Sequence, residues 1–216
     1  MNISLIMMGL TDMKGEFRCI SGYHKEKSKY FRPLLNPKNG RRIDHNFCTQ
    51  ITKEIKLFIE ATFEVESFFD NPESPHIEDF YISRLIEVKE IFQSRKQIKD
   101  FLHQISDSSI KSVYGDFIEI INGSPVVPED CGHRSLGTIV AKSCKVYKNN
   151  LGRVRVDIID QTGYQLNNLP CVAHDMEYKK VGKYNNIPVR LGLTRLWKKD
   201  KMDEEYYWIQ ISEVFP

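Results

Sequence analysis

A histidine and two carboxylates lie within four residues of one another in the first half of the sequence. His76, Glu78 and Asp79 follow a proline-containing stretch. A histidine beside two carboxylates is suited to acid–base catalysis or to holding a metal ion. The sequence offers no second histidine close by, and the segment reads as a short loop after an acidic run. We therefore expect a turn that orients the following strand, with no catalytic role.

Cysteine and histidine recur in the second half at spacings that zinc sites use. The residues are Cys131, His133, Cys144, Cys171 and His174. Zinc ribbons and fingers usually show two tight cysteine pairs, which this sequence lacks. We predict no metal site and no cofactor, and we expect buried thiols at strand positions. The five cysteines of the chain are scattered, which favours reduced thiols and a cytoplasmic location.

Two motifs of catalytic or nucleotide-binding proteins are missing from the sequence. The segment 132–137 lacks the Lys-Ser/Thr ending of a phosphate-binding loop, and no Gly-x-Ser-x-Gly nucleophile elbow occurs. The sequence therefore indicates a protein that is not an enzyme.

Charge is unevenly distributed along the chain, although the net charge is only +2. Residues 14–56 hold 11 basic and 4 acidic residues, and residues 142–201 hold 13 basic and 5 acidic residues. Between them, residues 60–79 hold 7 acidic residues and no lysine or arginine. The basic stretches are either footprints for a polyanion or solvated faces with internal ion pairs.

The first basic stretch supplies three candidate contacts to nucleic acid. Arg18 and Arg32 lie at the ends of neighbouring predicted strands, and Tyr30 offers an aromatic platform on which a base can stack. The alternative is structural, with Arg32 paired to Glu78 or Asp79 across the mouth of a barrel.

The second basic stretch supplies the remaining candidates. They are Arg153, Arg155, Lys179, Lys180, Arg190, Arg195 and Trp197. Strand alternation places Arg153 and Arg155 on one exposed face, and lysines near a tryptophan suit phosphate binding and base stacking. The alternative is a solvated sheet face whose lysines protect an edge strand.

Short strands with turn signals between them dominate the periodicity. We predict strands over 2–9, 15–22, 29–35 and 55–69 in the first half, and over 135–147, 153–160, 188–196 and 205–214 in the second. Apolar residues at three- and four-residue spacing predict one or two amphipathic helices over 82–105. The pattern is typical of small β-barrels, of the OB-fold or SH3-like kind.

Four short motifs, in order, resemble the dual-OB-containing domain family of prokaryotes. They are Phe17-Arg18-Cys19-Ile20-Ser21-Gly22, Tyr30-Phe31-Arg32-Pro33-Leu34, Pro75-His76-Ile77-Glu78-Asp79, and the pair formed by Arg190-Leu191-Gly192-Leu193-Thr194-Arg195 with the final strand Trp208-Ile209-Gln210-Ile211-Ser212-Glu213-Val214-Phe215-Pro216. The chain departs from the family where Phe31 replaces a tryptophan and where Asp79 replaces an asparagine.

The resemblance implies a mainly β protein with two small OB-like antiparallel barrels and an intervening helical segment. We expect a first barrel over 1–83, a helical connector over 84–112 and a second barrel over 113–216. The resemblance also implies binding of single-stranded or structured RNA or DNA, as a subunit of an antiviral defence or conflict complex. The alternative is a protein-interaction scaffold that regulates a partner effector. No run of 18 apolar residues occurs, so no membrane partner is expected.

Overall fold

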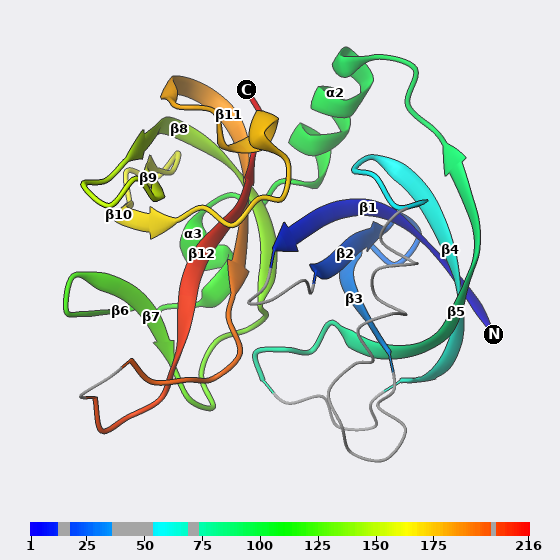
Figure 1. Cartoon of the computed structure of the whole chain (residues 1–216), viewed down its shortest axis with the longest axis horizontal. Helices are drawn as coiled ribbons and strands as arrows, with labels where there is room; N and C mark the ends of the chain where they lie inside the picture. The colour runs from blue at the N-terminus through cyan, green and yellow to red at the C-terminus, as the bar shows by residue number, and fades with distance from the viewer. Residues whose placement is uncertain (13–17, 36–53, 69–73, 200–201) are drawn as a thin grey trace. The chain divides into compact units, whose positions relative to one another are not determined.

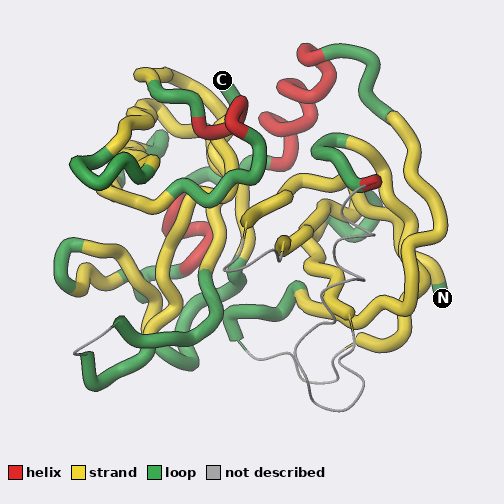
Figure 2. Tube along the Cα trace, in the orientation of Figure 1, coloured by secondary structure: helices red, strands yellow, loops and turns green. Residues whose placement is uncertain are grey.

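The computed structural model describes residues 1–12, 18–35, 54–68, 74–199 and 202–216. Strands dominate these residues (Figure 2), which confirms the prediction of a mainly β protein. The chain divides into two compact units. The first unit comprises Met1–Pro72 and Glu78–Ile98, and the second comprises Glu73–Ile77 and Lys99–Pro216. None of the helices in the described part is long and apolar enough to cross a membrane.

The first unit is a closed five-stranded barrel (Figure 1). Its strands are β1 (Asn2–Asp12), β2 (Arg18–His24), β3 (Lys29–Leu35), β4 (Ile59–Phe68) and β5 (Asp79–Glu90). They close in the order β1-β2-β3-β5-β4, with β3 and β5 parallel and the other pairs antiparallel. A five-stranded Greek-key barrel is the OB architecture. Alternate residues of β1, including Ile3, Leu5 and Met7, fill its core.

Gly22 lies where two strands of this barrel approach closely. A β-carbon at this position would lie 2.7 Å from the Leu5 Cβ and 2.8 Å from the backbone oxygen of Ile6. Both atoms belong to or adjoin the backbone of β1, so neither can move aside as a flexible side chain would. The position therefore requires glycine for steric reasons.

We expect Gly22→Ala to lower the free energy of unfolding of the first unit by about 1–3 kcal/mol, the usual cost of overpacking. Urea denaturation followed by circular dichroism measures the change. Gly192→Ala is the matched control, because its added carbon would meet the Ser212 hydroxyl at 3.1 Å, which can rotate. Equal stability losses for the two variants would contradict the steric argument.

The second unit is a seven-stranded sheet. Its strands are β6 (Glu119–Ile121), β7 (Ser124–Pro128), β8 (Leu136–Lys148), β9 (Val154–Ile159), β10 (Gln165–Pro170), β11 (Gly182–Leu193) and β12 (Tyr206–Val214), in the order β10-β9-β8-β11-β12-β7-β6. Cys171, just after β10, forms a parallel bridge with Ile211 of β12. The five strands β8 to β12 thus repeat the order of the first barrel, and β6 and β7 extend one side (Figure 1).

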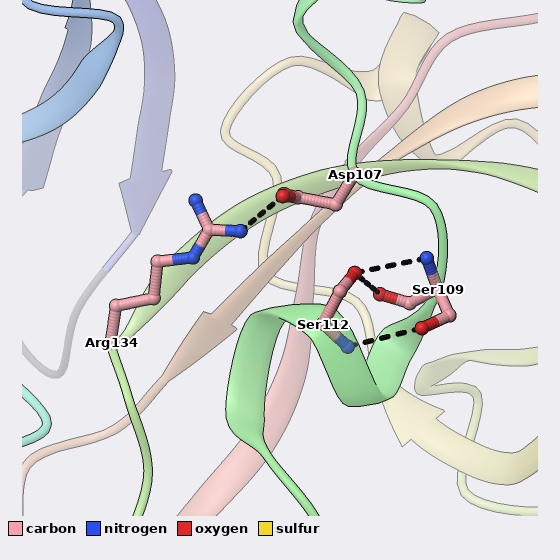
Figure 3. Close-up of polar contacts among 4 residues, drawn as sticks. All are labelled: Asp107, Ser109, Ser112 and Arg134. Atoms are coloured by element: carbon pink, nitrogen blue, oxygen red, sulfur yellow. Dashed lines mark hydrogen bonds and ion pairs between the residues drawn. The ribbon is translucent and has the colours of Figure 1, made fainter.

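Two short helices and one single turn complete the described elements. They are α2 (Arg95–Ile105), α3 (Ile110–Tyr114) and the 3-10 turn η1 (Met176–Lys179). Ser109 caps α3, since its hydroxyl accepts from the Ser112 amide and the Ser112 hydroxyl accepts from the Ser109 amide, each at 3.0 Å (Figure 3). Nearby, Arg134 forms an ion pair with Asp107. Burial raises the pKa of Asp107, and the charge of Arg134 opposes that shift.

Asp160 ties α3 to the turn between β9 and β10. Its fully buried carboxylate accepts from the amide of Ile110 at 2.9 Å, from the amide of Thr162 at 2.9 Å and from the amide of Tyr164 at 3.0 Å. The Thr162 hydroxyl donates a fourth hydrogen bond, of 2.6 Å. Because these donors satisfy the buried charge, the β9–β10 hairpin is held in a defined place.

The prediction of helix over 82–105 is correct only for its second half, because β5 continues to Glu90. β5 carries one extra residue at Ser83 and another at Ile86, where the register with β4 shifts. Each extra residue breaks the period-two alternation of a strand. Ile82, Leu85 and Val88 consequently fall three residues apart and imitate a helix. The first unit keeps this strand, so it extends beyond residue 83.

Candidate nucleic-acid interface

The second unit offers an exposed surface at the position where OB barrels bind oligonucleotides. That position comprises the outer face of the second and third strands, with the loops joining strands one to two and four to five. Here these are β9, β10 and the loop segments 149–153 and 194–199. Exposed cations stand in both loops, namely Arg153, Arg195 and Lys198. We refer to this surface as the β9–β10 interface.

Trp197 and Lys199 of the loop segment 194–199 both contact Trp208, a residue of β12. The rings of Trp197 and Trp208 lie 5.5 Å apart, and the Trp208 indole nitrogen donates to the carbonyl oxygen of Trp197 at 3.0 Å. The Lys199 ammonium lies 3.6 Å from the centre of the Trp208 ring and 3.1 Å from the Ser124 hydroxyl oxygen. Trp208 is buried, whereas Trp197 is 43% exposed. Trp197 is therefore held in place with part of its ring open to solvent.

Arg155 contributes positive charge from β9. Partial burial lowers the pKa of Lys199, and the nearby charge of Arg155 lowers it further. Arg155 is half-buried, and its Nε is a buried donor with no hydrogen-bond partner among the described residues. The charges of Arg155 and Lys199 repel each other. A bound anion would lessen this repulsion and could accept a hydrogen bond from the Arg155 Nε.

Asp157 lies on the same strand and limits the positive charge there. Its Oδ1 accepts from the Tyr147 hydroxyl at 3.1 Å and from the Asn168 amide at 2.8 Å. Burial and this hydrogen bond raise the pKa of Tyr147. The Lys145 ammonium lies 5.1 Å from the centre of the Tyr147 ring. The carboxylate thus links β9 to both neighbouring strands, β8 and β10.

Lys179 and Lys180 follow β10 rather than the loops of the interface. The Lys179 ammonium donates to the carbonyl oxygen of Ala173 at 2.7 Å, which fixes it against its own turn. Lys180 is exposed. Of the two lysines, Lys180 is the one whose ammonium is not used by the hydrogen bond to Ala173.

Three other predicted contacts occupy different surroundings. Arg190 is fully buried and pairs with Glu213 at 3.3 Å, and Arg32 is buried and pairs with Asp79 at 3.0 Å. The pair of Arg32 with Asp79 is the structural alternative that the sequence offered for Arg32.

Tyr30 is also buried, with its ring 5.2 Å from that of Tyr23. The side chain of Arg18, at the start of β2, lies outside the described residues.

His76 and its two acidic neighbours have separate structural partners. Nε2 of the buried His76 lies 3.1 Å from the carbonyl oxygen of Thr194, and its ring is 5.3 Å from that of Tyr207. Asp79 holds Arg32, and the Glu78 carbonyl oxygen accepts from the Arg32 amide at 2.8 Å. These contacts fit a turn that joins two elements. Within the described ranges, no three histidine, cysteine or acidic side chains are grouped to hold a metal ion.

Burial makes two of the cysteines unreactive. Desolvation raises the pKa of Cys144 to about 12 and that of Cys171 to about 11. Only the thiolate is a good nucleophile or zinc ligand. Cys144 is thus a buried apolar residue of β8, and Cys171, just after β10, is half-buried against the same core.

We expect Cys144 and Cys171 to react with iodoacetamide at pH 8 far more slowly in the folded protein than in urea. A raised pKa leaves almost no thiolate at that pH, and burial also blocks access. Mass spectrometry of the alkylated peptides resolves each site. Equal rates in the folded and unfolded protein would contradict the burial of these thiols.

Sequence reasoning missed the part that Trp208 and Ser124 play in this surface. Trp208 lies in an alternating strand, where the pattern predicts a core residue. Ser124 belongs to no motif or periodic pattern. The useful signal is the pairing of β12 with β7, where Trp208 lies opposite Val126. That pairing depends on the chain between them, so periodicity within one strand does not reveal it.

Comparisons with known proteins identify no family for this chain. No protein-family model matches the sequence, and no curated protein matches it. Two solved structures align over 98% of the chain. A murine DNA-binding protein bound to double-stranded DNA has 9% identity, 92% of its own chain covered and a TM-score of 0.33. The tetrameric p202 HIN2 has 12% identity, 93% covered and a TM-score of 0.29. Likeness at this level decides neither fold nor function.

Proposed function

We propose that the protein binds single-stranded or unpaired nucleic acid at the β9–β10 interface. The observation that carries the proposal is Trp197, a partly exposed ring fixed by Trp208. The exposed Lys198 follows it in the chain, Arg155 acts on the neighbouring Lys199, and Arg153 is exposed in the other loop segment of the interface. Bases stack on aromatic rings whatever their sequence, and phosphates bind cations. A duplex keeps its bases stacked inside, so the ring favours an unpaired strand.

We further propose that the protein acts without catalysis, as a cytoplasmic subunit of a prokaryotic defence or conflict complex. The lack of catalysis is supported by the separate structural partners of His76 and Asp79. The biological setting is supported by the sequence motifs that resemble the dual-OB-containing domain family and by the strand order that β8 to β12 share with the first barrel.

Fluorescence anisotropy with labelled 20-nucleotide RNA, 20-nucleotide DNA and duplex DNA tests the proposal. We expect tighter binding of at least one single strand than of the duplex, and affinity that falls steeply between 50 and 200 mM salt. Trp197→Ala should weaken binding by roughly 5- to 150-fold, the usual effect of losing one stacked base. Binding of no nucleic acid at low salt would refute the proposal.

One observation favours the alternative function, a scaffold for a partner protein. β6 is an edge strand of the second sheet, and Ile120 on it is 60% exposed, with Phe117 just before it 44% exposed. An edge strand with apolar side chains can accept an extended segment of another protein. If nucleic acid does not bind, partner capture by the wild type and by Ile120→Lys would distinguish this function.

A further inference from the structure

The hairpin between β2 and β3 concentrates lysine and aromatic side chains on the first barrel. Lys25, Lys27 and Lys29 stand within five residues and are exposed, with Glu26 as the one acidic residue among them. Within the described residues no ion pair involves these lysines. Three lysines and one glutamate thus give the hairpin a net positive charge.

The ammonium of Lys27 covers two aromatic rings. It lies 5.6 Å from the centre of the Phe31 ring and 5.4 Å from the centre of the Phe68 ring. Phe68 is 39% exposed and stacks on Phe80, with ring centres 5.6 Å apart and an angle of 25° between the planes. Phe80 is fully buried and anchors the stack in the core. Phe68 is therefore a fixed ring whose outer side is shielded only in part.

Lys25 extends the same surface. Its ammonium lies 6.0 Å from the centre of the Phe92 ring, which in turn contacts Phe58 edge-on at 6.4 Å. Two lysines of one turn thus stand beside aromatic rings of the first unit. Two described acidic residues of the first unit are engaged in ion pairs: Glu64 binds Arg84 at 3.0 Å, and Asp79 binds Arg32. Glu66, two residues before Phe68, is exposed and opposes an anionic ligand.

We propose that this surface, formed by Lys25, Lys27, Phe31 and Phe68, is a second contact for the single strand, in which Lys25 and Lys27 each bind a phosphate and a base takes the place of the Lys27 ammonium over the rings. The inference rests on the proposed function of the β9–β10 interface. An exposed cation–π contact is worth on the order of two- to five-fold in an equilibrium constant. Stacking of a base is worth roughly 5- to 150-fold. The exchange therefore favours the bound strand, and the displaced ammonium gains a phosphate.

Two variants separate the parts of this contact. Phe68→Leu keeps an apolar side chain over Phe80 and removes the flat ring, so binding of labelled 20-nucleotide oligothymidine should weaken about five-fold or more. Lys25→Gln with Lys27→Gln should flatten the dependence of log K on log salt by about 1.4, which is about 0.7 for each lost phosphate contact. Lys96→Gln with Lys99→Gln, exposed on α2, is the matched control and should leave the slope unchanged.

The outcomes distinguish this inference from the proposed function. If the wild type binds and Trp197→Ala weakens it, while the Phe68 and lysine variants bind with wild-type affinity and slope, the second contact is refuted and the first stands. If the wild type binds no single strand, both are refuted. Circular dichroism of each variant shows whether the barrel is intact, and Lys25→Gln with Lys27→Gln changes only exposed side chains, so it keeps the test valid if Phe68→Leu unfolds.

Discussion

Glu213→Gln should lower the free energy of unfolding of the second unit by about 3–5 kcal/mol, the usual cost of removing one charge of a buried ion pair. The Arg190 and Glu213 side chains are 0% and 1% exposed and lie 3.3 Å apart. Without the carboxylate, the guanidinium stays charged in a place that water does not reach. Because whole domains are stable by only about 5–15 kcal/mol, this is a large share of the total.

Tryptophan fluorescence during urea denaturation measures this loss specifically. The chain has 2 tryptophans, and both Trp197 and Trp208 belong to the second unit. Arg190→Met with Glu213→Leu removes both charges and keeps apolar volume, so we expect it to recover much of the stability. If Glu213→Gln unfolds at the wild-type urea concentration, the pair does not stabilise the unit as described.

Arg153→Glu with Lys198→Glu should weaken binding of a single strand by roughly 100-fold at low salt. In water, each reversal removes an attraction of about 1 kcal/mol and adds a repulsion of similar size, which salt partly screens. Both side chains are exposed, one in each loop of the β9–β10 interface, so the fold should tolerate the change.

Anisotropy titrations at 50 and 200 mM salt check this result. Lys96→Glu with Lys99→Glu changes the net charge by the same amount on the exposed surface of α2 and serves as control. A specific interface predicts a large loss for the first pair and a small one for the second. Equal losses would show that binding follows net charge alone, which would contradict the assignment of the site.

The sequence predicts the mainly β fold well because most strands alternate regularly. In β9, Val156 and Ile158 are buried and Arg153, just before it, is exposed, as alternation requires. Alternation does not identify β5, where the extra residues Ser83 and Ile86 give apolar residues a helical spacing although no helix forms. Such extra residues are defined by the partner strand β4, so the sequence of β5 alone does not reveal them.

The site is harder to predict because the sequence around an arginine does not show which residue the arginine contacts. Arg153 and Arg190 look alike in the sequence, yet the first is exposed and the second lies opposite Glu213 in the register of β11 and β12. That register shifts between Arg190 and Leu191, so counting along the strands does not pair them. Burial, which sequence pattern gives only indirectly, decides which cations are available to a ligand.

Hydrogen–deuterium exchange with and without a bound 20-nucleotide single strand tests the central claim most directly. We expect slower exchange in the loop segments 149–153 and 194–199, where Arg153 and Trp197 lie at the β9–β10 interface. The helix α2 should exchange equally in both states. Binding with no protection of either loop segment would contradict the account.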